Sequence, residues 1–144
     1  VVVRSKTAPE PETITPTAGA RILVVEDSQD VLDVITMILR RAGYSVSTAI
    51  TGDIAKSQLK VDSECDLLIT DMVMPGETQG SDLALHVAKV LPDLPVIMMS
   101  GYAEADSQNS QQSQSIEPVS FHLTKPVQRR DLLSAIETVL QRAV

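Results

Sequence analysis

The sequence has little of several residue types that mark particular classes of protein. Its 144 residues include no tryptophan and a single cysteine, Cys65, so a disulfide framework is excluded and a reducing compartment is expected. The longest apolar runs, such as Ile22 to Val25, are far too short to cross a bilayer. Val1 to Lys6 do not form a secretion signal, because the apolar stretch is short and the charges follow it. We therefore expect a cytoplasmic domain that makes no contact with a membrane.

Basic residues are also scarce. Twelve Lys and Arg stand against 19 Asp and Glu, which gives a net charge of −7 and a pI of about 4.7. Proteins that bind nucleic acid need Lys and Arg to meet the phosphates. The charge balance therefore predicts that nucleic acid is not a partner.

The composition changes near residue 20. Residues 1–19 contain three prolines and no apolar periodicity, which is typical of a flexible linker or tail. Residues 20–144 are long enough for one domain with one core. Because the chain starts with Val and a proline-rich stretch precedes the domain, we expect this domain to stand at the C-terminus of a longer protein.

From Arg21 onward, short apolar runs alternate with stretches of helical spacing. Runs of strand length predict buried strands, and apolar residues three and four apart predict helices. The expected strands are 22–25, 44–49, 66–70, 95–99 and 119–123, and the expected helices are 28–42, 53–61, 81–91 and 130–143. This alternation predicts an α/β fold with a doubly wound, five-stranded parallel sheet of flavodoxin-like order 2-1-3-4-5 and helices on both faces.

One segment interrupts the alternation. Residues 107–115 hold only Ser, Gln and Asn, where a further helix would be expected. A segment without an apolar residue cannot bury a face of its own. We expect either a short frayed helix near 103–108 or a mobile loop.

Polar residues stand at the carboxyl ends of four predicted strands. Glu26 and Asp27 follow the first strand, Asp71 the third, Ser100 the fourth and Lys125 the fifth. These four strands are neighbours in the order 2-1-3-4-5, so their polar ends meet at the sheet edge where such folds bind ligands. Each residue alone is equally well explained as a helix cap or a turn, and only their joint arrangement indicates a site.

The chemistry of this set indicates phosphoryl transfer. Crowded carboxylates raise one another's pKa, and a divalent cation such as Mg²⁺, which prefers oxygen ligands, relieves the repulsion. A lysine and a hydroxyl can meet phosphoryl oxygens, and charge neutralisation supplies most of the catalysis in such reactions. Asp71 ends the central strand and is the expected nucleophile.

The sequence resembles the receiver domain of two-component response regulators from about Arg21 to Ala143. Four motifs carry the resemblance: Ile22-Leu23-Val24-Val25-Glu26-Asp27, Leu68-Ile69-Thr70-Asp71-Met72-Val73-Met74-Pro75-Gly76, Ser100-Gly101 and Leu123-Thr124-Lys125-Pro126. The resemblance implies a phosphoprotein in which Asp71 accepts a phosphoryl group from a phosphohistidine on a histidine kinase or a histidine phosphotransfer protein. It also implies that Glu26, Asp27, Asp71 and the backbone carbonyl of Val73 bind Mg²⁺.

The remaining roles follow from the same resemblance. Ser100 would turn toward the phosphoryl group and Lys125 would pair with it, while the Lys125–Pro126 bond would be cis. Phosphorylation would switch the surface formed by the fourth helix, the fifth strand and the last helix. The domain would be the C-terminal receiver of a hybrid sensor histidine kinase, would catalyse only its own phosphorylation and dephosphorylation, and could form a weak homodimer.

The sequence departs from the family at the signalling face. His122 stands three residues before the lysine, where the family usually has Tyr or Phe. It is equally interpreted as a half-exposed residue at the end of a strand. His86 could suggest a phosphohistidine, but its apolar neighbours favour a partly packed helix residue, and Cys65 is interpreted as packing.

The same residues bear on two alternative functions, a phosphatase and a non-phosphorylated scaffold. A phosphatase or phosphotransferase of the haloacid dehalogenase type needs a second Asp two residues after the nucleophile, and Val73 stands there instead. A receiver-like scaffold with weak or no phosphorylation remains as an alternative, although all five site positions are filled. Binding of Mg²⁺ would separate the scaffold from a working receiver.

Overall fold

A computed structural model describes residues 17–61, 64–74, 76, 78–101 and 119–143. The predictions for residues 1–16, for a helix near 103–108 and for the polar segment 107–115 lie outside these ranges. None of the helices in the described ranges has both the length and the apolar character needed to cross a membrane. Residues 17–19 form a turn that is tied to the domain, because Gly19 N–H donates to the carbonyl of Gly43 at 2.9 Å.

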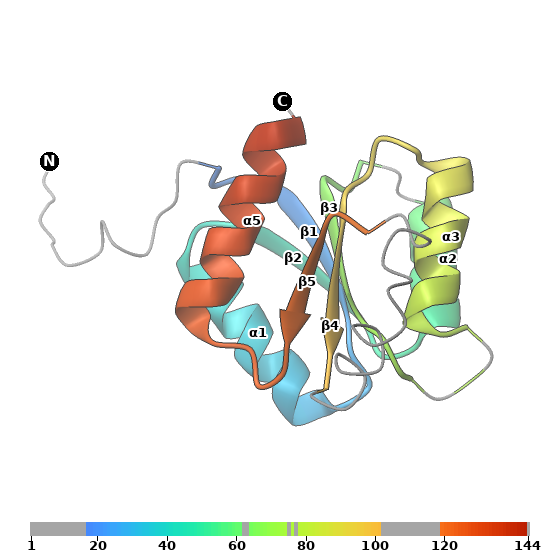
Figure 1. Cartoon of the computed structure of the whole chain (residues 1–144), viewed down its shortest axis with the longest axis horizontal. Coiled ribbons are helices and arrows are strands. Elements are labelled where there is room, and N and C mark those ends of the chain that lie inside the picture. Colours follow the sequence, from blue (N-terminus) through green and yellow to red (C-terminus); the bar gives the residue numbers. More distant parts are fainter. Residues whose placement is uncertain (1–16, 62–63, 75, 77, 102–118, 144) are drawn as a thin grey trace, which may run out of the picture.

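Five parallel strands form a single sheet in the order β2-β1-β3-β4-β5 (Figure 1). The strands are β1 Arg21–Val25, β2 Ser45–Ala49, β3 Leu67–Asp71, β4 Val96–Ser100 and β5 Phe121–Thr124. Every residue of the central strands β3 and β4 is buried, as expected for strands covered on both faces. The observed order confirms the predicted flavodoxin-like sheet.

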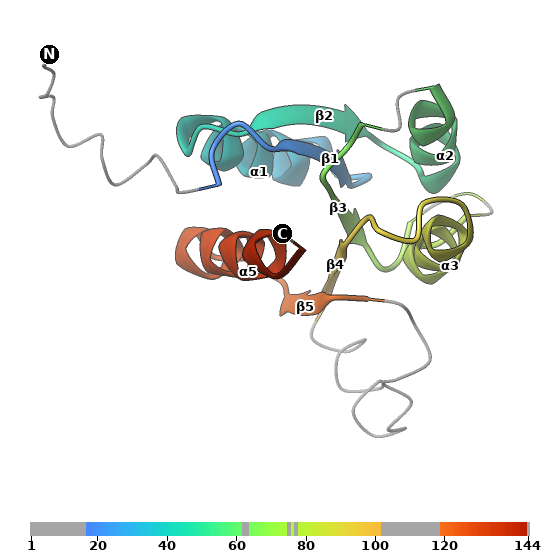
Figure 2. The same cartoon turned by 90° about the horizontal axis from the view of Figure 1, so that it is seen from above.

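Helices cover both faces of the sheet, as predicted. They are α1 Gln29–Arg41, α2 Gly52–Val61, α3 Gly80–Val90 and α5 Arg129–Ala143. Figure 2 shows α1 and α5 on one face and α2 and α3 on the other. Two clusters of buried side chains follow the same division, and adjacent β3 residues contribute to different clusters: Ile69 packs with the α1 and α5 side, and Leu68 with the α2 and α3 side.

Local signals in the sequence account for the limits of α1. The Ser28 hydroxyl accepts a hydrogen bond from the N–H of Val31, as an N-cap does. Gly43 adopts a φ of 101°, which ends the helix in a conformation that favours glycine. The largest difference from prediction is at β5, which begins at Phe121 and not at 119. Ser120 N–H still donates to the carbonyl of Val96 at 2.8 Å, so the chain joins the sheet just before the strand.

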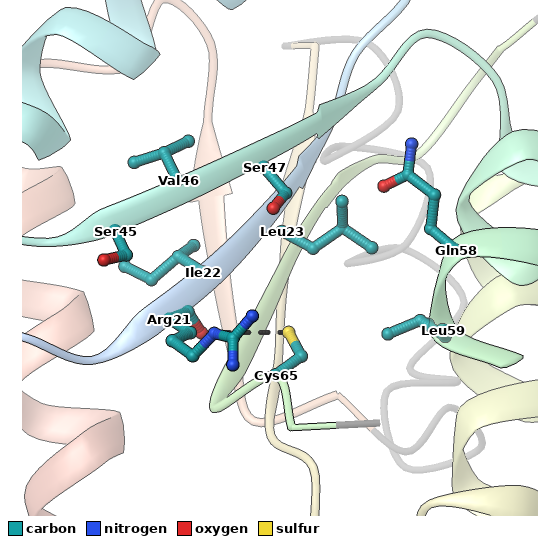
Figure 3. Close-up of a pocket in the computed structure, with 9 residues that line it drawn as sticks. All are labelled: Arg21, Ile22, Leu23, Ser45, Val46, Ser47, Gln58, Leu59 and Cys65. Atoms are coloured by element: carbon teal, nitrogen blue, oxygen red, sulfur yellow. Dashed lines mark hydrogen bonds between the residues drawn. The ribbon is translucent and has the colours of Figure 1, made fainter. Parts of the chain in front are cut away.

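The amino ends of β1 and β2 border a hollow of about 260 Å³, which Figure 3 shows together with Leu59 and Gln58 of α2. Cys65 lies at its side, half-buried, and its thiol donates to the carbonyl of Leu67 at 3.1 Å. The same side chain packs against the α2 and α3 cluster. Cys65 therefore packs in the way the sequence predicts.

Side chains cover the outer side of the edge strand β2. Ser45 N–H donates to the carbonyl of Ala20, just before β1, and the Ala49 carbonyl accepts from the N–H of Glu26, just after β1. The carbonyls of the intervening residues Val46 and Thr48 accept from the helices instead: Arg40 Nη2 lies 3.5 Å from the first and Gln58 Nε2 lies 3.0 Å from the second.

Candidate functional site

Three carboxylates meet at the carboxyl ends of β1 and β3. One oxygen atom from each of Glu26, Asp27 and Asp71 lies within 4.8 Å of the others. Glu26 and Asp71 are buried, at 1% and 5% exposure, whereas Asp27 is exposed. Thus the structure brings together the three acidic side chains that the sequence predicts to meet.

Glu26 is a buried carboxylate with few partners. Its Oε2 accepts from the N–H of Ser28 at 3.0 Å. Burial raises the pKa of Glu26, and the nearby Asp71 carboxylate adds to the rise, while the Ser28 N–H and Lys125 oppose it. Its Oε1 receives no hydrogen bond of good geometry in the described structure. An oxygen of this kind is a ready ligand for a cation.

Lys125 supplies the positive charge in the site. Its Nζ donates to Asp71 Oδ2 at 2.9 Å and forms an ion pair with Glu26 Oε1 at the same distance. Burial lowers the pKa of Lys125, but its bonds with the two carboxylates outweigh this effect, so the pKa is raised. The ammonium therefore remains charged between Glu26 and Asp71.

The backbone around Lys125 fixes its position. The Lys125–Pro126 peptide bond is cis, as the resemblance implies. The N–H of Lys125 donates to the carbonyl of Ser100 at 2.8 Å, and Ser100 pairs with Thr124 in the sheet register. Ser100 is 2% exposed at the end of β4. The serine and the lysine are thus held on neighbouring strand ends next to Asp71.

Gln79 organises the loop that follows Asp71, a role that the sequence analysis missed. Its side chain accepts from Met74 N–H at 2.8 Å and donates to the carbonyls of Met74 at 2.6 Å and Gly76 at 3.2 Å. Its own N–H donates to Asp82 at 3.0 Å. The spacing of Gln79 and Asp82 before an apolar helix was a signal for an N-terminal cap, but nothing in the sequence indicated the bonds back into the loop. Val73, whose carbonyl is an expected metal ligand, lies in this loop with its side chain exposed.

The same loop is fastened to α2. Thr78 is buried and its hydroxyl donates to Asp53 Oδ1. Gly52 approaches the loop so closely that an added Cβ would lie 2.5 Å from the carbonyl oxygen of Thr78. Gly80 meets the Asp71 carbonyl in the same way. Both contacts require glycine, and together they fix the loop against α2 and the end of β3.

The two histidines differ in exposure, and neither belongs to the acidic cluster. His122 is an exposed residue of β5, and His86 is partly buried in α3. The position of His86 agrees with its interpretation as a partly packed helix residue. His122 differs from the half-exposed strand-end residue that was expected, because it is exposed and stands second in β5.

Fold and site define a class of protein, and comparison with known sequences identifies it. The family model described as "Response regulator receiver domain" matches residues 22–137. The chain belongs to this family. It is 33% identical over 120 residues to the response regulator receiver protein CpdR of Brucella abortus. The aligned region covers 83% of this chain and 96% of CpdR. It is 36% identical over 125 residues to the DNA-binding transcriptional regulator NtrC of Azospirillum brasilense, covering 85% of this chain but only 24% of NtrC.

Solved structures agree with this assignment. A response regulator receiver domain protein from Clostridium thermocellum superposes with a TM-score of 0.76 at 29% identity, covering 85% of this chain and 95% of that one. The response regulator protein TrrA of Thermotoga maritima, solved in complex with Mg²⁺-BeF, gives a TM-score of 0.72 at 26% identity and covers 84% and 99%. The fold is therefore that of receiver domains along nearly the whole described chain.

Proposed function

We propose that this chain is a phosphoacceptor receiver of a two-component phosphorelay, with Asp71 as the residue that takes the phosphoryl group. The observation that carries the proposal is the place of Asp71. It is buried at the end of the central strand, bonded to the Lys125 ammonium, and within 4.8 Å of two further carboxylates. A carboxylate held in this way is both shielded and charge-compensated, as a nucleophile for phosphoryl transfer must be.

The acidic cluster fits Mg²⁺. Glu26, Asp27, Asp71 and the Val73 carbonyl would supply hard oxygen ligands, and the three carboxylate oxygens already lie within 4.8 Å of one another. Bound Mg²⁺ would neutralise the carboxylates and polarise a phosphoryl oxygen. The relative TrrA, which was solved with Mg²⁺-BeF, supports the same assignment for this chain.

In the proposed reaction, an oxygen of Asp71 attacks the phosphorus of a phosphohistidine. The P–O bond forms as the P–N bond breaks, and the electron pair of that bond returns to the donor imidazole. Lys125 would pair with a phosphoryl oxygen, and the Ser100 hydroxyl would donate to another, since both lie at neighbouring strand ends. These contacts would stabilise charge where it develops in the transition state.

The partner of this site would be a histidine kinase or a histidine phosphotransfer protein in the cytoplasm. Residues 20–144 would be the receiver, preceded by a linker over 1–19 whose last residues, 17–19, are tied to the domain by hydrogen bonds. The segment between β4 and β5, with β5 and α5, would form the face that responds to phosphorylation. Neither nucleic acid nor a membrane is proposed as a direct partner of this domain, and a weak homodimer is compatible with it.

Labelling with a small phosphodonor tests the proposal. With acetyl phosphate and Mg²⁺, intact-mass measurement should show one added phosphoryl group, which is lost in Asp71→Asn because an amide is not a nucleophile for phosphorus. Mass detection suits this chain, because it has no tryptophan to report the reaction by fluorescence. A label that persists in Asp71→Asn would show the assignment to be wrong. A wild-type chain that neither binds Mg²⁺ nor takes the label would be the receiver-like scaffold.

A further inference from the structure

Helices α2 and α3 cover the face of the sheet opposite α1 and α5 (Figure 2). Residues of both helices line a groove. Its volume is about 570 Å³. The side chains that line it include Lys56, Ser57, Leu59 and Lys60 from α2, and His86 and Val90 from α3. Lys56 and Lys60 are one helical turn apart, as are His86 and Val90, so the lining runs along both helices.

The groove gathers positive charge in a chain whose net charge is −7. Burial lowers the pKa of His86, and the ammonium groups of Lys56, Lys89 and Lys60 lower it further. All three lysines therefore lie within electrostatic reach of one imidazole. Within the described part of the chain, none of the three makes an ion pair.

The acidic residue of the groove offsets only part of this charge. Asp53 lines the groove, but its Oδ1 accepts the hydrogen bond from Thr78, which holds it toward the loop after Asp71. Unpaired lysines that surround a histidine repel one another. An anionic partner would relieve that repulsion.

The floor of the groove is apolar. Its apolar lining residues are Leu59, which is 4% exposed, Val90, which is 53% exposed, and Leu91. An apolar floor with a cationic rim complements a segment that carries apolar side chains on one face and carboxylates beside them. Since the lining follows two helices, an elongated segment fits it better than a compact anion would.

We propose that the α2–α3 groove binds an acidic amphipathic helix of a partner protein. Apolar side chains of that helix would cover Leu59 and Val90, as in other helix-in-groove complexes. Its carboxylates would pair with Lys56, Lys60 and Lys89, which steers association and sets orientation. The surface is separate from the Asp71 site, so the proposal does not rest on phosphorylation.

A designed peptide tests the groove. The probe is an acetylated helix of about 16 residues with Leu at positions i, i+3, i+4 and i+7 and Glu at the flanking positions. Its control carries Gln in place of every Glu. In NMR titrations of the full chain, the Glu peptide should shift signals of α2 and α3 and raise the pKa of His86, because carboxylates favour the imidazolium. Binding should weaken as salt is added, and the Gln peptide should bind at least several-fold more weakly.

Matched variants locate the binding. Lys56→Gln, Lys60→Gln and Lys89→Gln combined should weaken the Glu peptide about tenfold, since each exposed ion pair adds little alone. Arg129→Gln with Arg130→Gln, which removes exposed charge from α5, should leave binding unchanged. Circular dichroism and the Asp71 labelling reaction would show that both variants are folded.

Several results would overturn the proposal. These are no binding of the Glu peptide, equal binding of the Gln peptide, shifts confined to α1 and α5, or an equal effect of the α5 variant. If the chain instead self-associates and the triple lysine variant abolishes this, the groove serves a second copy and not an acidic helix.

Discussion

Glu26 is a buried carboxylate of the candidate site, and its burial lowers the stability of the fold. It is 1% exposed, its pKa is raised first of all by burial, and its Oε1 has the Lys125 ammonium, 2.9 Å away, as its partner. A residue selected only to cap α1 would stay at the surface, as Asp27 does. Burying a carboxylate is costly unless its pairing is good, and here the pairing is partial.

Replacing the acidic pair should therefore cost no stability when metal is absent. We expect Glu26→Gln with Asp27→Asn, measured in chelator, to have a free energy of unfolding equal to that of the wild type or higher by about 1 kcal/mol. Urea unfolding with and without Mg²⁺ is the measurement. Mg²⁺ should stabilise the wild type by mass action and leave the variant unchanged. A clear loss of stability in chelator would instead make the pair a structural helix cap.

His86 should give the domain a weak dependence of stability on pH. Because its pKa is lowered in the folded chain, the unfolded state binds more protons between the lowered value and 6.5. Stability is therefore unaffected by His86 above this window and falls as the pH falls through it. His86→Gln should remove this part of the slope, worth well under about 1 kcal/mol for a partly exposed group. An unchanged slope in denaturant titrations at pH 5.5 to 7.5 would contradict the assignment.

At the scale of elements, the loop after β3 is held by contacts that the catalytic chemistry does not itself require. Gln79 bonds three times to the loop backbone, and Thr78 ties the loop to Asp53 at the start of α2. These bonds hold the loop in place before a metal binds. A backbone carbonyl of the loop can therefore meet a metal without the loop having to become ordered during binding. Preorganisation of this kind lowers the entropy cost of binding.

Gln79→Ala should consequently weaken Mg²⁺ binding by about tenfold, the scale seen for residues that support metal ligands. The loss of stability should be about 1 to 3 kcal/mol, because two of the freed backbone groups belong to the buried Met74. Isothermal titration with Mg²⁺ measures the first and urea unfolding the second. Gln29→Ala is a matched control, since Gln29 also bonds through its side chain, to Asp33 in α1. Equal Mg²⁺ affinity in the Gln79→Ala and Gln29→Ala variants would show that Gln79 does not support the metal site.

The sequence predicted most of the elements and the members of the acidic cluster, and physical reasons explain what it did not predict. Strand and helix positions followed from apolar periodicity, and the meeting of Glu26, Asp71 and Lys125 followed from strand order. The ties made by Gln79 and Thr78 were not predictable in this way, because loop contacts depend on the distance between elements. The gathering of lysines from α2 and α3 near His86 was not predicted either, because only the packing of the two helices brings these residues together.

At the scale of the whole molecule, the sheet divides the interior into two cores. Ile69 and Leu68 are adjacent in β3 and both fully buried, yet they pack into different clusters. Side chains of neighbouring strand residues point to opposite faces. Their contributions to stability should therefore be nearly independent despite their closeness in sequence.

We expect Leu68→Ala to cost about 3 kcal/mol and Ile69→Val about 1 kcal/mol. The double variant should lose the sum of the two to within about 0.5 kcal/mol, as measured by urea unfolding of all four proteins. A double variant that loses much less than the sum would mean that one core relaxes through the sheet into the other.

The covered edge of β2 bears on how the protein behaves at high concentration. Arg40 and Gln58 reach the carbonyls of Val46 and Thr48, and these are groups that an incoming strand would need for pairing. A chain that docks here must first displace a guanidinium and an amide anchored on two different helices. The side chains of Arg40 and Gln58 therefore oppose growth of the sheet into a fibril by addition at β2. Truncating both side chains should make the purified protein more prone to form thioflavin-positive aggregates.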